Sequence, residues 1–447
     1  MAGKKTQAQL TPEEKLQQAL VPEAEQPYKV PANWCWTYLK NVSDCLDNFR
    51  KPINANERNA RLGDVPYYGA TGQVGWIDDY LTNEELVLLG EDGAPFLDLL
   101  KNKAYLINGK AWVNNHAHIL RSKFGTMGNR LLIEYLNSFD FTGFVTGTTR
   151  LKLTQASMNK IIIPLVPLAE QQRIVERIET LFAKLDEAKE KLQNTLDTFE
   201  TRKAAILHKA FTGELTANWR KQYGLTIDSW EENTLNDIAS YKKGPFGSSI
   251  TKAMFVPKTA NTYKVYEQGN VIRKDLTYGH YYITSEKYQE LKGFSVKAGD
   301  ILISCAGTIG EVYKLPPECE EGVINQALMR VRLNQNIIEG YFCYYFGEII
   351  KDDVIDKSNG TAMKNIPPFK VLKAIQIKLP TINEQTEIVR IIDNLLAKEQ
   401  QAHSIAQNAI AQIDLIKKSI LARAFRGQLA TNNPADEPAI ELLKKVL

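Results

Sequence analysis

The chain has 447 residues, with 44% hydrophobic and 24% charged residues, a length and balance typical of a soluble protein with two domains and connecting elements. No apolar run approaches the roughly eighteen residues of a membrane span, and the polar start MAGKKTQAQLTPEEKL lacks the features of a signal peptide, so we expect a cytoplasmic protein. The five cysteines include no C-x-x-C pair, which argues against a zinc ribbon or a disulfide framework. The net charge is only +3, so a polyanionic partner requires basic residues that are clustered locally.

The first two segments are an N-terminal extension, residues 1–30, and a strand-rich domain, residues 31–165. In the extension, Thr11-Pro-Glu-Glu14 has the pattern of a helix cap, so a short helix is predicted there, packed on the long helices or on a partner. The domain shows short apolar runs separated by Gly and Asn turns. In its loops, basic residues such as Arg61 alternate with amide and aromatic residues. The candidate DNA-binding residues of this segment are Arg50, Lys51, Asn54, Arg58, Tyr67, Tyr68, Asn114, Asn115, Thr148, Thr149 and Arg150.

A long helix is predicted in residues 166–218. It begins just after Pro167 and runs without proline or glycine to Gly213, as expected for helix start and stop signals. At a rise of 1.5 Å per residue, about 42 helical residues form a rod roughly 60 Å long. Apolar residues recur every seven positions, which is the period of a coiled coil. These seam residues are Ile178, Leu185, Leu192, Phe199 and Ile206.

A second strand-rich domain is predicted in residues 219–380, again with short apolar runs and polar loops. Its candidate DNA-binding residues are Lys242, Lys243, Ser248, Ser249, Gln268, Asn270, Arg273, Lys274, Asn325, Gln326, Thr361 and Lys364. In both domains lysine and arginine can fix the register on phosphates, while arginine, asparagine and glutamine can read base edges. The density of these residues in both domains indicates DNA binding, although no single residue identifies a base contact.

A second long helix is predicted in residues 381–432, followed by a C-terminal tail, residues 433–447. The helix carries Ile392, Ile413 and Ile420 on the equivalent seam, with Glu399 placed within it. It aligns without a gap to the first helix, and both end in A-F-x-G-x-L. The chain is therefore a tandem duplication.

Two duplicated helices, each with one apolar stripe, most simply bury these stripes against each other in antiparallel sense. The predicted fold is α+β, with two mixed strand-rich domains separated by two long antiparallel coiled-coil helices and related by a pseudo-twofold axis.

The chain carries no motif for catalysis. It has no glycine-rich cofactor motif and no phosphate-binding G-x-x-x-x-G-K-[ST] loop. His116 and His118 alternate on one face of a predicted strand, but no third ligand is evident, so no metal site is predicted. Asn365-Ile-Pro-Pro-Phe369 resembles the N-P-P-[YF] motif with which amino-methyltransferases hold a flipped base. An isoleucine separates its asparagine from the prolines, and we interpret it as a turn at a domain end.

The arrangement resembles the specificity (S) subunits of type I restriction-modification systems from residue 31 to about residue 440. Four matching motifs belong to the long helices: P-L-A-E-Q-Q-R-I-V from Pro167, P-T-I-N-E-Q-T-E-I-V from Pro380, and the two A-F-x-G-x-L endings. The tryptophans that open the strand-rich segments, Trp34 and Trp230, match as well. Three further segments are similar to target recognition domains, namely Arg50 to Asn54, Tyr67 to Gly72 and Gly147 to Arg150.

The resemblance implies that each strand-rich segment is a target recognition domain that reads one half of a split, asymmetric site on double-stranded DNA. It implies that the helices form a spacer and bind two modification subunits, which methylate adenine, and that restriction subunits join as a defence against foreign DNA. S-adenosylmethionine, ATP and magnesium are then expected in the partner subunits and no cofactor in this chain. The alternatives are the recognition subunit of a related type II enzyme, a coiled-coil scaffold without a DNA role, and a fused methyltransferase or nuclease.

Overall fold

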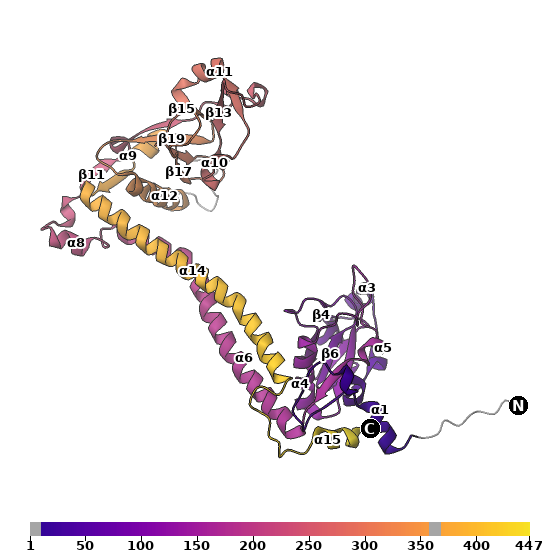
Figure 1. Ribbon diagram of the computed structural model, residues 1–447. Helices are drawn as coiled ribbons and strands as arrows, with labels where there is room; N and C mark the ends of the chain where they lie inside the picture. The colour runs from indigo at the N-terminus through magenta and orange to yellow at the C-terminus, as the bar shows by residue number, and fades with distance from the viewer. Residues whose placement is uncertain (1–9, 357–367) are drawn as a thin grey trace. The chain divides into compact units, whose positions relative to one another are not determined.

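A computed structural model describes residues 10–356 and 368–447, and the chain divides into two compact units (Figure 1). Unit 1 comprises Met1–Asn194 and Ala406–Leu447, and unit 2 comprises Thr195–Ile405. Each unit contains one strand-rich domain and a stretch of paired long helices, which confirms the predicted α+β class. Within the described residues, no helix is long and apolar enough to cross a membrane.

Two four-stranded sheets form the strand-rich domain of unit 1. In the first, all neighbouring strands are antiparallel, in the order β2 (Ser43–Cys45), β9 (Ala117–Ser122), β6 (Leu86–Gly90) and β7 (Ala104–Ile107). The second has the order β4 (Gly72–Ile77), β3 (Val65–Gly69), β8 (Lys110–Val113) and β5 (Thr82–Asn83), with β3 and β8 parallel. The apolar run of β6 is buried throughout because Val87 and Leu89 face one hydrophobic cluster and Leu86 and Leu88 face another.

Unit 2 repeats this topology. Its first sheet has the antiparallel order β12 (Ala239–Lys243), β19 (Leu328–Leu333), β16 (Ile301–Ser304) and β17 (Val312–Lys314). Its second has the order β14 (Tyr282–Thr284), β13 (Thr262–Tyr266), β18 (Gly322–Ile324) and β15 (Ser295–Val296), again with a parallel central pair. The duplication detected in the helices therefore extends through the strand-rich domains.

A two-stranded antiparallel sheet joins the beginning and the end of each strand-rich segment. In unit 1, β1 (Cys35–Tyr38) pairs with β10 (Ile162–Leu165), and in unit 2, β11 (Glu231–Thr234) pairs with β20 (Gln376–Leu379). Because each long helix starts a few residues after β10 or β20, the chain enters and leaves each domain next to the start of a long helix.

The second long helix, α14 (Ile382–Ala424), is continuous over 43 residues. The first was predicted as one long helix, but Thr198, with φ −89° and ψ 1°, divides it into α6 (Leu168–Asp197) and α7 (Phe199–Phe211). Beside the break, Arg202 Nη2 donates to the Thr195 carbonyl (3.1 Å), the acceptor that a continuous helix offers to the Phe199 N–H.

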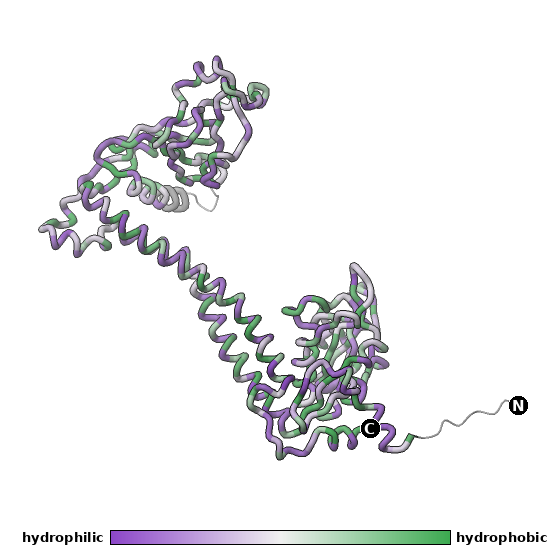
Figure 2. Tube along the Cα trace, in the orientation of Figure 1, coloured by the Kyte–Doolittle hydropathy of each residue, from purple (hydrophilic) through white to green (hydrophobic). Residues whose placement is uncertain are grey.

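In each unit the long helices pack in antiparallel sense. In unit 1, Lys189 Nζ lies 3.1 Å from Asp414 Oδ1 and Lys417 Nζ lies 2.6 Å from Asp186 Oδ1. The same sense holds in unit 2, where Arg202 Nε lies 2.7 Å from Glu399 Oε2 and the ring centres of Phe199 and His403 lie 4.8 Å apart. The glutamate predicted within the seam therefore has a cationic partner. Figure 2 shows hydrophobic and hydrophilic residues alternating along α6 and α14. Among the predicted seam residues, the buried ones are Ile178, Ile392 and Ile413, and the half-buried ones are Leu185, Leu192, Phe199, Ile206 and Ile420.

The extension begins as predicted. Helix α1 (Pro12–Ala19) starts at Thr11, whose hydroxyl accepts from the Glu14 N–H (3.2 Å) while Glu14 Oε2 accepts from the Thr11 N–H (2.8 Å). It contacts the C-terminal helix α15 (Ala439–Val446), and Ala19 belongs to the hydrophobic core of unit 1. The extension therefore forms part of this unit.

Candidate nucleic-acid interface

The tryptophan that opens each strand-rich segment donates a hydrogen bond to a buried glutamate at the start of a long helix. Trp34 Nε1 lies 2.7 Å from Glu170 Oε2, and Trp230 Nε1 lies 3.0 Å from Glu384 Oε2. Both glutamates are fully buried. The tryptophan and the glutamate of the repeated E-Q pair thus join each strand-rich domain to the long helix that follows it. No role was predicted for the two carboxylates, although the repetition of the same motif at the start of both helices is a signal for one.

Each buried glutamate also binds the segment that follows the end of the other long helix. Glu170 accepts from Thr431 Oγ1 (3.1 Å) and Asn432 Nδ2 (2.8 Å). Glu384 accepts from Thr216 Oγ1 (2.7 Å) and Arg220 Nη1 (2.5 Å). Three chain segments therefore meet at each glutamate, and they set the position of the domain on the helix pair of its unit.

Some candidate DNA-binding residues of unit 1 have structural roles. Tyr67 is only 1% exposed, which corrects its assignment as a surface contact, and the Arg58 guanidinium carbon lies 4.9 Å from the centre of its ring. Tyr68 is half-buried and packs against Tyr105. Asn54 Oδ1 accepts from the Glu57 N–H (2.9 Å) and caps α3 (Ala55–Ala60).

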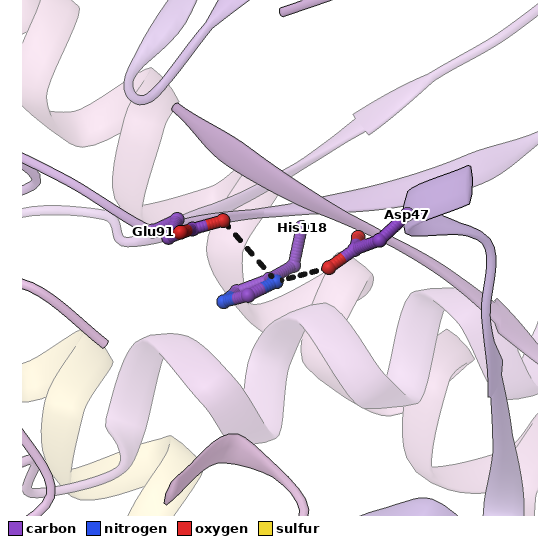
Figure 3. Close-up of side chains that lie close together, drawn as sticks. All are labelled: Asp47, Glu91 and His118. Atoms are coloured by element: carbon purple, nitrogen blue, oxygen red, sulfur yellow. Dashed lines mark hydrogen bonds and ion pairs between the residues drawn. The ribbon is translucent and has the colours of Figure 1, made fainter. Parts of the chain in front are cut away.

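Arg50 belongs to a network of charged side chains around His118. Figure 3 shows His118 between Asp47 and Glu91 in this network. His118, which is 1% exposed, places Nδ1 2.6 Å from Asp47 Oδ2 and 3.7 Å from Glu91 Oε2. Arg50 pairs with both carboxylates, and Lys152 Nζ lies 3.3 Å from Glu91 Oε1. Burial acts to raise the pKa of Asp47, but the hydrogen bond and charge of His118, with smaller contributions from the Ile119 N–H and Arg50, outweigh burial and lower this pKa.

The donor atoms of Asp47, Glu91 and His118 lie within 4.8 Å of one another, which is close enough to hold a metal ion. Two features favour an ion-pair network instead. The Arg50 guanidinium already bridges the two carboxylates. In addition, His118 Nε2 lies 2.9 Å from the Leu153 carbonyl, so both ring nitrogens face oxygen acceptors.

This network connects the polar loops of unit 1. Next to it, Arg150 pairs with Asp92, and His116 Nδ1 lies 3.3 Å from Asp92 Oδ2. Thr148, Thr149 and Arg150 are exposed, as are Lys51 and Asn115. Three of the predicted groups are thereby brought together, namely Arg50 with Lys51, Asn114 with Asn115, and residues 148–150.

Asn114 and Asn325 occupy equivalent turns in the two units. Asn114 donates its backbone N–H to the Tyr68 carbonyl (3.1 Å), and Asn325 donates to the Tyr266 carbonyl (3.0 Å). Each side-chain oxygen accepts from the N–H two residues later, at 2.8 Å and 3.0 Å respectively. The two asparagines therefore shape the turns, and the exposed residues that follow them are Asn115 and Gln326.

In unit 2, Lys242, Lys243 and Ser248 are exposed, while Ser249 is half-buried. Gln268 Nε2 donates to the carbonyl oxygens of Ala306 and Thr308 and holds that loop.

Asn270 does not fit the prediction. It is fully buried, its Oδ1 accepts from the Glu267 N–H, and its Nδ2 donates to the Asp275 and Tyr278 carbonyls, so it shapes a loop instead of contacting DNA. Asn270 lies in α10 (Gln268–Arg273), and Arg273 and Lys274 at the end of this helix are exposed. Arg273 lies over the Tyr278 ring. Thr361, Lys364 and Asn365 lie outside the described residues.

Comparisons with known proteins agree with this architecture. The family profile described as "Type I restriction modification DNA specificity domain" matches residues 32–198 and 227–410. A putative type I restriction enzyme specificity subunit of Haemophilus influenzae is 28% identical over 387 residues, covering 86% of this chain and 92% of that protein. The type I restriction enzyme EcoBI specificity subunit of Escherichia coli is 27% identical over 305 residues, covering 64% of this chain and 62% of that protein.

Two solved structures share the fold. The HsdS subunit from Thermoanaerobacter tengcongensis has a TM-score of 0.59 and 18% identity, covering 91% of this chain and 100% of the other. A chain from a study of complex assembly and conformational transition of the type I R-M system has a TM-score of 0.60 and 17% identity, covering 90% and 100%. With the family profile matching both halves of the sequence, the chain belongs to the family of type I restriction-modification DNA specificity subunits.

Proposed function

We propose that this chain is the DNA-recognition subunit of a type I restriction-modification complex and that it carries no catalytic site of its own. Each strand-rich domain reads one half of a split, asymmetric site in double-stranded DNA. The paired helices set the gap between the half-sites and dock two modification subunits. Restriction subunits bind to this assembly, which acts in the cytoplasm against foreign DNA.

The observation that carries this proposal is the doubling of one family domain in a single chain. The two copies share sheet order and the tryptophan–glutamate contact, but their loops differ in sequence. Two unlike reading surfaces on one repeated framework suit a DNA site with two unlike halves.

The loops of both units carry groups that suit DNA. Lys51, Arg150, Lys242 and Lys243 are exposed and can contact phosphates, while Asn115 and Gln326 present amides that can read base edges. S-adenosylmethionine belongs to the modification subunits, and ATP and magnesium belong to the restriction subunits. The exposed apolar residues Ile405, Leu415 and Ile416 of α14 offer contacts for a docking partner.

Methylation mapping tests the proposal. The chain is expressed with the methyltransferase and helicase-nuclease encoded beside it, and adenine methylation is mapped over the host genome. We expect one bipartite motif with a constant gap. Exchange of residues 31–165 for the matching segment of a relative should change one half-site and leave the other unchanged.

Each alternative function predicts a different result. A coiled-coil scaffold without a DNA role predicts the same methylation pattern with and without this chain. A fused methyltransferase predicts methyl transfer by the purified chain alone. A change in both half-sites after the exchange would contradict independent reading by the two domains.

A further inference from the structure

One aromatic side chain in unit 2 lies almost entirely in solvent. Phe246 is 87% exposed, the largest exposed fraction of any large apolar side chain in the described part of the chain. It follows β12 in the loop Gly244-Pro-Phe-Gly-Ser-Ser249, next to the exposed Lys242 and Lys243. The lysines and serines of this loop were predicted to bind DNA, whereas the phenylalanine between them was not among the predicted residues.

The loop is held firmly on both sides of Phe246. The Gly244 N–H donates to the Leu328 carbonyl (2.9 Å), Pro245 is buried, and the Ser249 N–H donates to the Phe246 carbonyl (2.8 Å). Gly244 also lies so close to Asn325 that a Cβ added there would stand 1.8 Å from the Asn325 carbonyl oxygen. The aromatic ring is therefore presented on a fixed backbone beside the Asn325–Gln326 turn.

The charge around this ring favours a nucleic acid. Residues 238–266 contain five lysines and no aspartate or glutamate. Two of the lysines are engaged, because Lys264 is buried and Lys258 Nζ lies 2.6 Å from Glu320 Oε2. The other three, Lys242, Lys243 and Lys252, are exposed. An apolar side chain among cationic groups suits a polyanion with stacked rings better than an apolar groove on a protein.

Unit 1 has a counterpart. Phe49 follows β2, the strand equivalent to β12, and is 48% exposed. It precedes Lys51, whose N–H donates to the Val113 carbonyl (3.2 Å) beside the Asn114 turn, just as Gly244 contacts the Asn325 turn. Each unit thus exposes one phenylalanine between the first strand of its first sheet and an asparagine turn.

We propose that Phe246 enters the base stack of the DNA as an apolar wedge, with Phe49 in the same role in unit 1. The inference deepens the proposed function and rests on it. Insertion between two bases buries the exposed ring and unstacks one base step. The ease of unstacking depends on sequence, so the wedge contributes specificity at a step where no hydrogen bond to a base edge is needed.

The experiment uses the full-length chain purified with its modification subunits and a duplex of the sequence found by methylation mapping. Single adenines of the duplex, other than the adenines that become methylated, are replaced by 2-aminopurine, whose fluorescence rises when the base is unstacked. We expect a rise at one step in each half-site on binding. Phe246→Ala should abolish the rise in one half-site only and weaken binding about tenfold, Phe49→Ala should abolish the other rise, and Phe246→Trp should retain the signal.

Two glycines provide a matched control. Gly244→Ala keeps the phenylalanine but displaces the loop, so it should reproduce the effect of Phe246→Ala. Gly247→Ala lies in the same loop, where no atom is within 4 Å of an added Cβ, and should behave as the wild type.

The outcomes separate the wedge from the function on which it rests. If the wild-type complex does not bind the mapped duplex, the proposed function itself fails. If it binds but Phe246→Ala leaves affinity and fluorescence unchanged, the wedge is refuted and DNA recognition stands. If Phe246→Ala releases the modification subunits while the chain still binds DNA, the phenylalanine faces a protein and the inference is wrong.

Discussion

Removal of the Glu384 carboxylate is the sharpest test of how each domain is fixed to its helix. Glu384 is fully buried and accepts from Trp230, Thr216 and Arg220. The Arg220 side chain is only 8% exposed, and its other contacts, to Thr216 Oγ1 and the Gly213 carbonyl, are to uncharged groups. Glu384→Ala therefore leaves a buried guanidinium without a counter-charge and two donors without an acceptor.

The expected loss is large. Breaking a buried ion pair by removal of one partner costs about 3–5 kcal/mol of unfolding free energy. The unsatisfied indole and hydroxyl donors act in the same direction, and water entering the space left by the carboxylate offsets part of their cost. We therefore expect about 4 kcal/mol, which lowers the Tm of a unit of this size by roughly 8–16 °C.

Urea unfolding of the full chain, followed by tryptophan fluorescence, measures the effect. Hydrogen exchange in residues 213–230 assigns it to this contact. The control is Glu387→Ala on the same helix, which removes an ion pair with Arg390, whose side chain is 63% exposed, and should cost less than about 1 kcal/mol. Replacement of both Glu384 and Arg220 by leucine should recover most of the loss. Equal stability of the two single variants would refute the reasoning.

Three further predictions concern pH and geometry. Burial, followed by the charge of Glu179, raises the pKa of Glu134 to about 6, so unfolding free energy falls as pH rises from 4.5 through 6. Glu134→Gln should gain about 1–2 kcal/mol at pH 7 and nothing at pH 4, and an equal gain at both would contradict this. The pKa of Asp47 is lowered, so Asp47→Asn should be less stable than wild type at pH 7, with a difference that shrinks in acid denaturation below about pH 4. Insertion of four residues at equivalent points of α6 and α14 lengthens each helix by about 6 Å. This should widen the mapped gap by one to two base pairs, at about 3.4 Å each, with both half-sites unchanged.

Features that depend on local sequence were predictable. The seven-residue period, the proline before each long helix and the glycine after it located both helices, because helix periodicity and termination are local properties. The capping box at Thr11 and Glu14 was predicted correctly for the same reason. Because the helices are duplicated, a second copy of the strand-rich domain was predicted as well, and the matching sheet orders of the two units agree with this.

Other features depend on contacts between residues far apart in the chain, so they became visible only in the folded molecule. Beside the break at Thr198, Arg202 contacts the Thr195 carbonyl, and in the charged loops of unit 1 His118 lies between Asp47 and Glu91. Asn270 was a candidate DNA contact, but its side chain is buried and its hydrogen bonds shape a loop. The family, the helices and the doubling were thus predictable from the amino-acid sequence. The structure decided which polar residues face solvent, because exposure depends on the packing of the whole unit around each side chain.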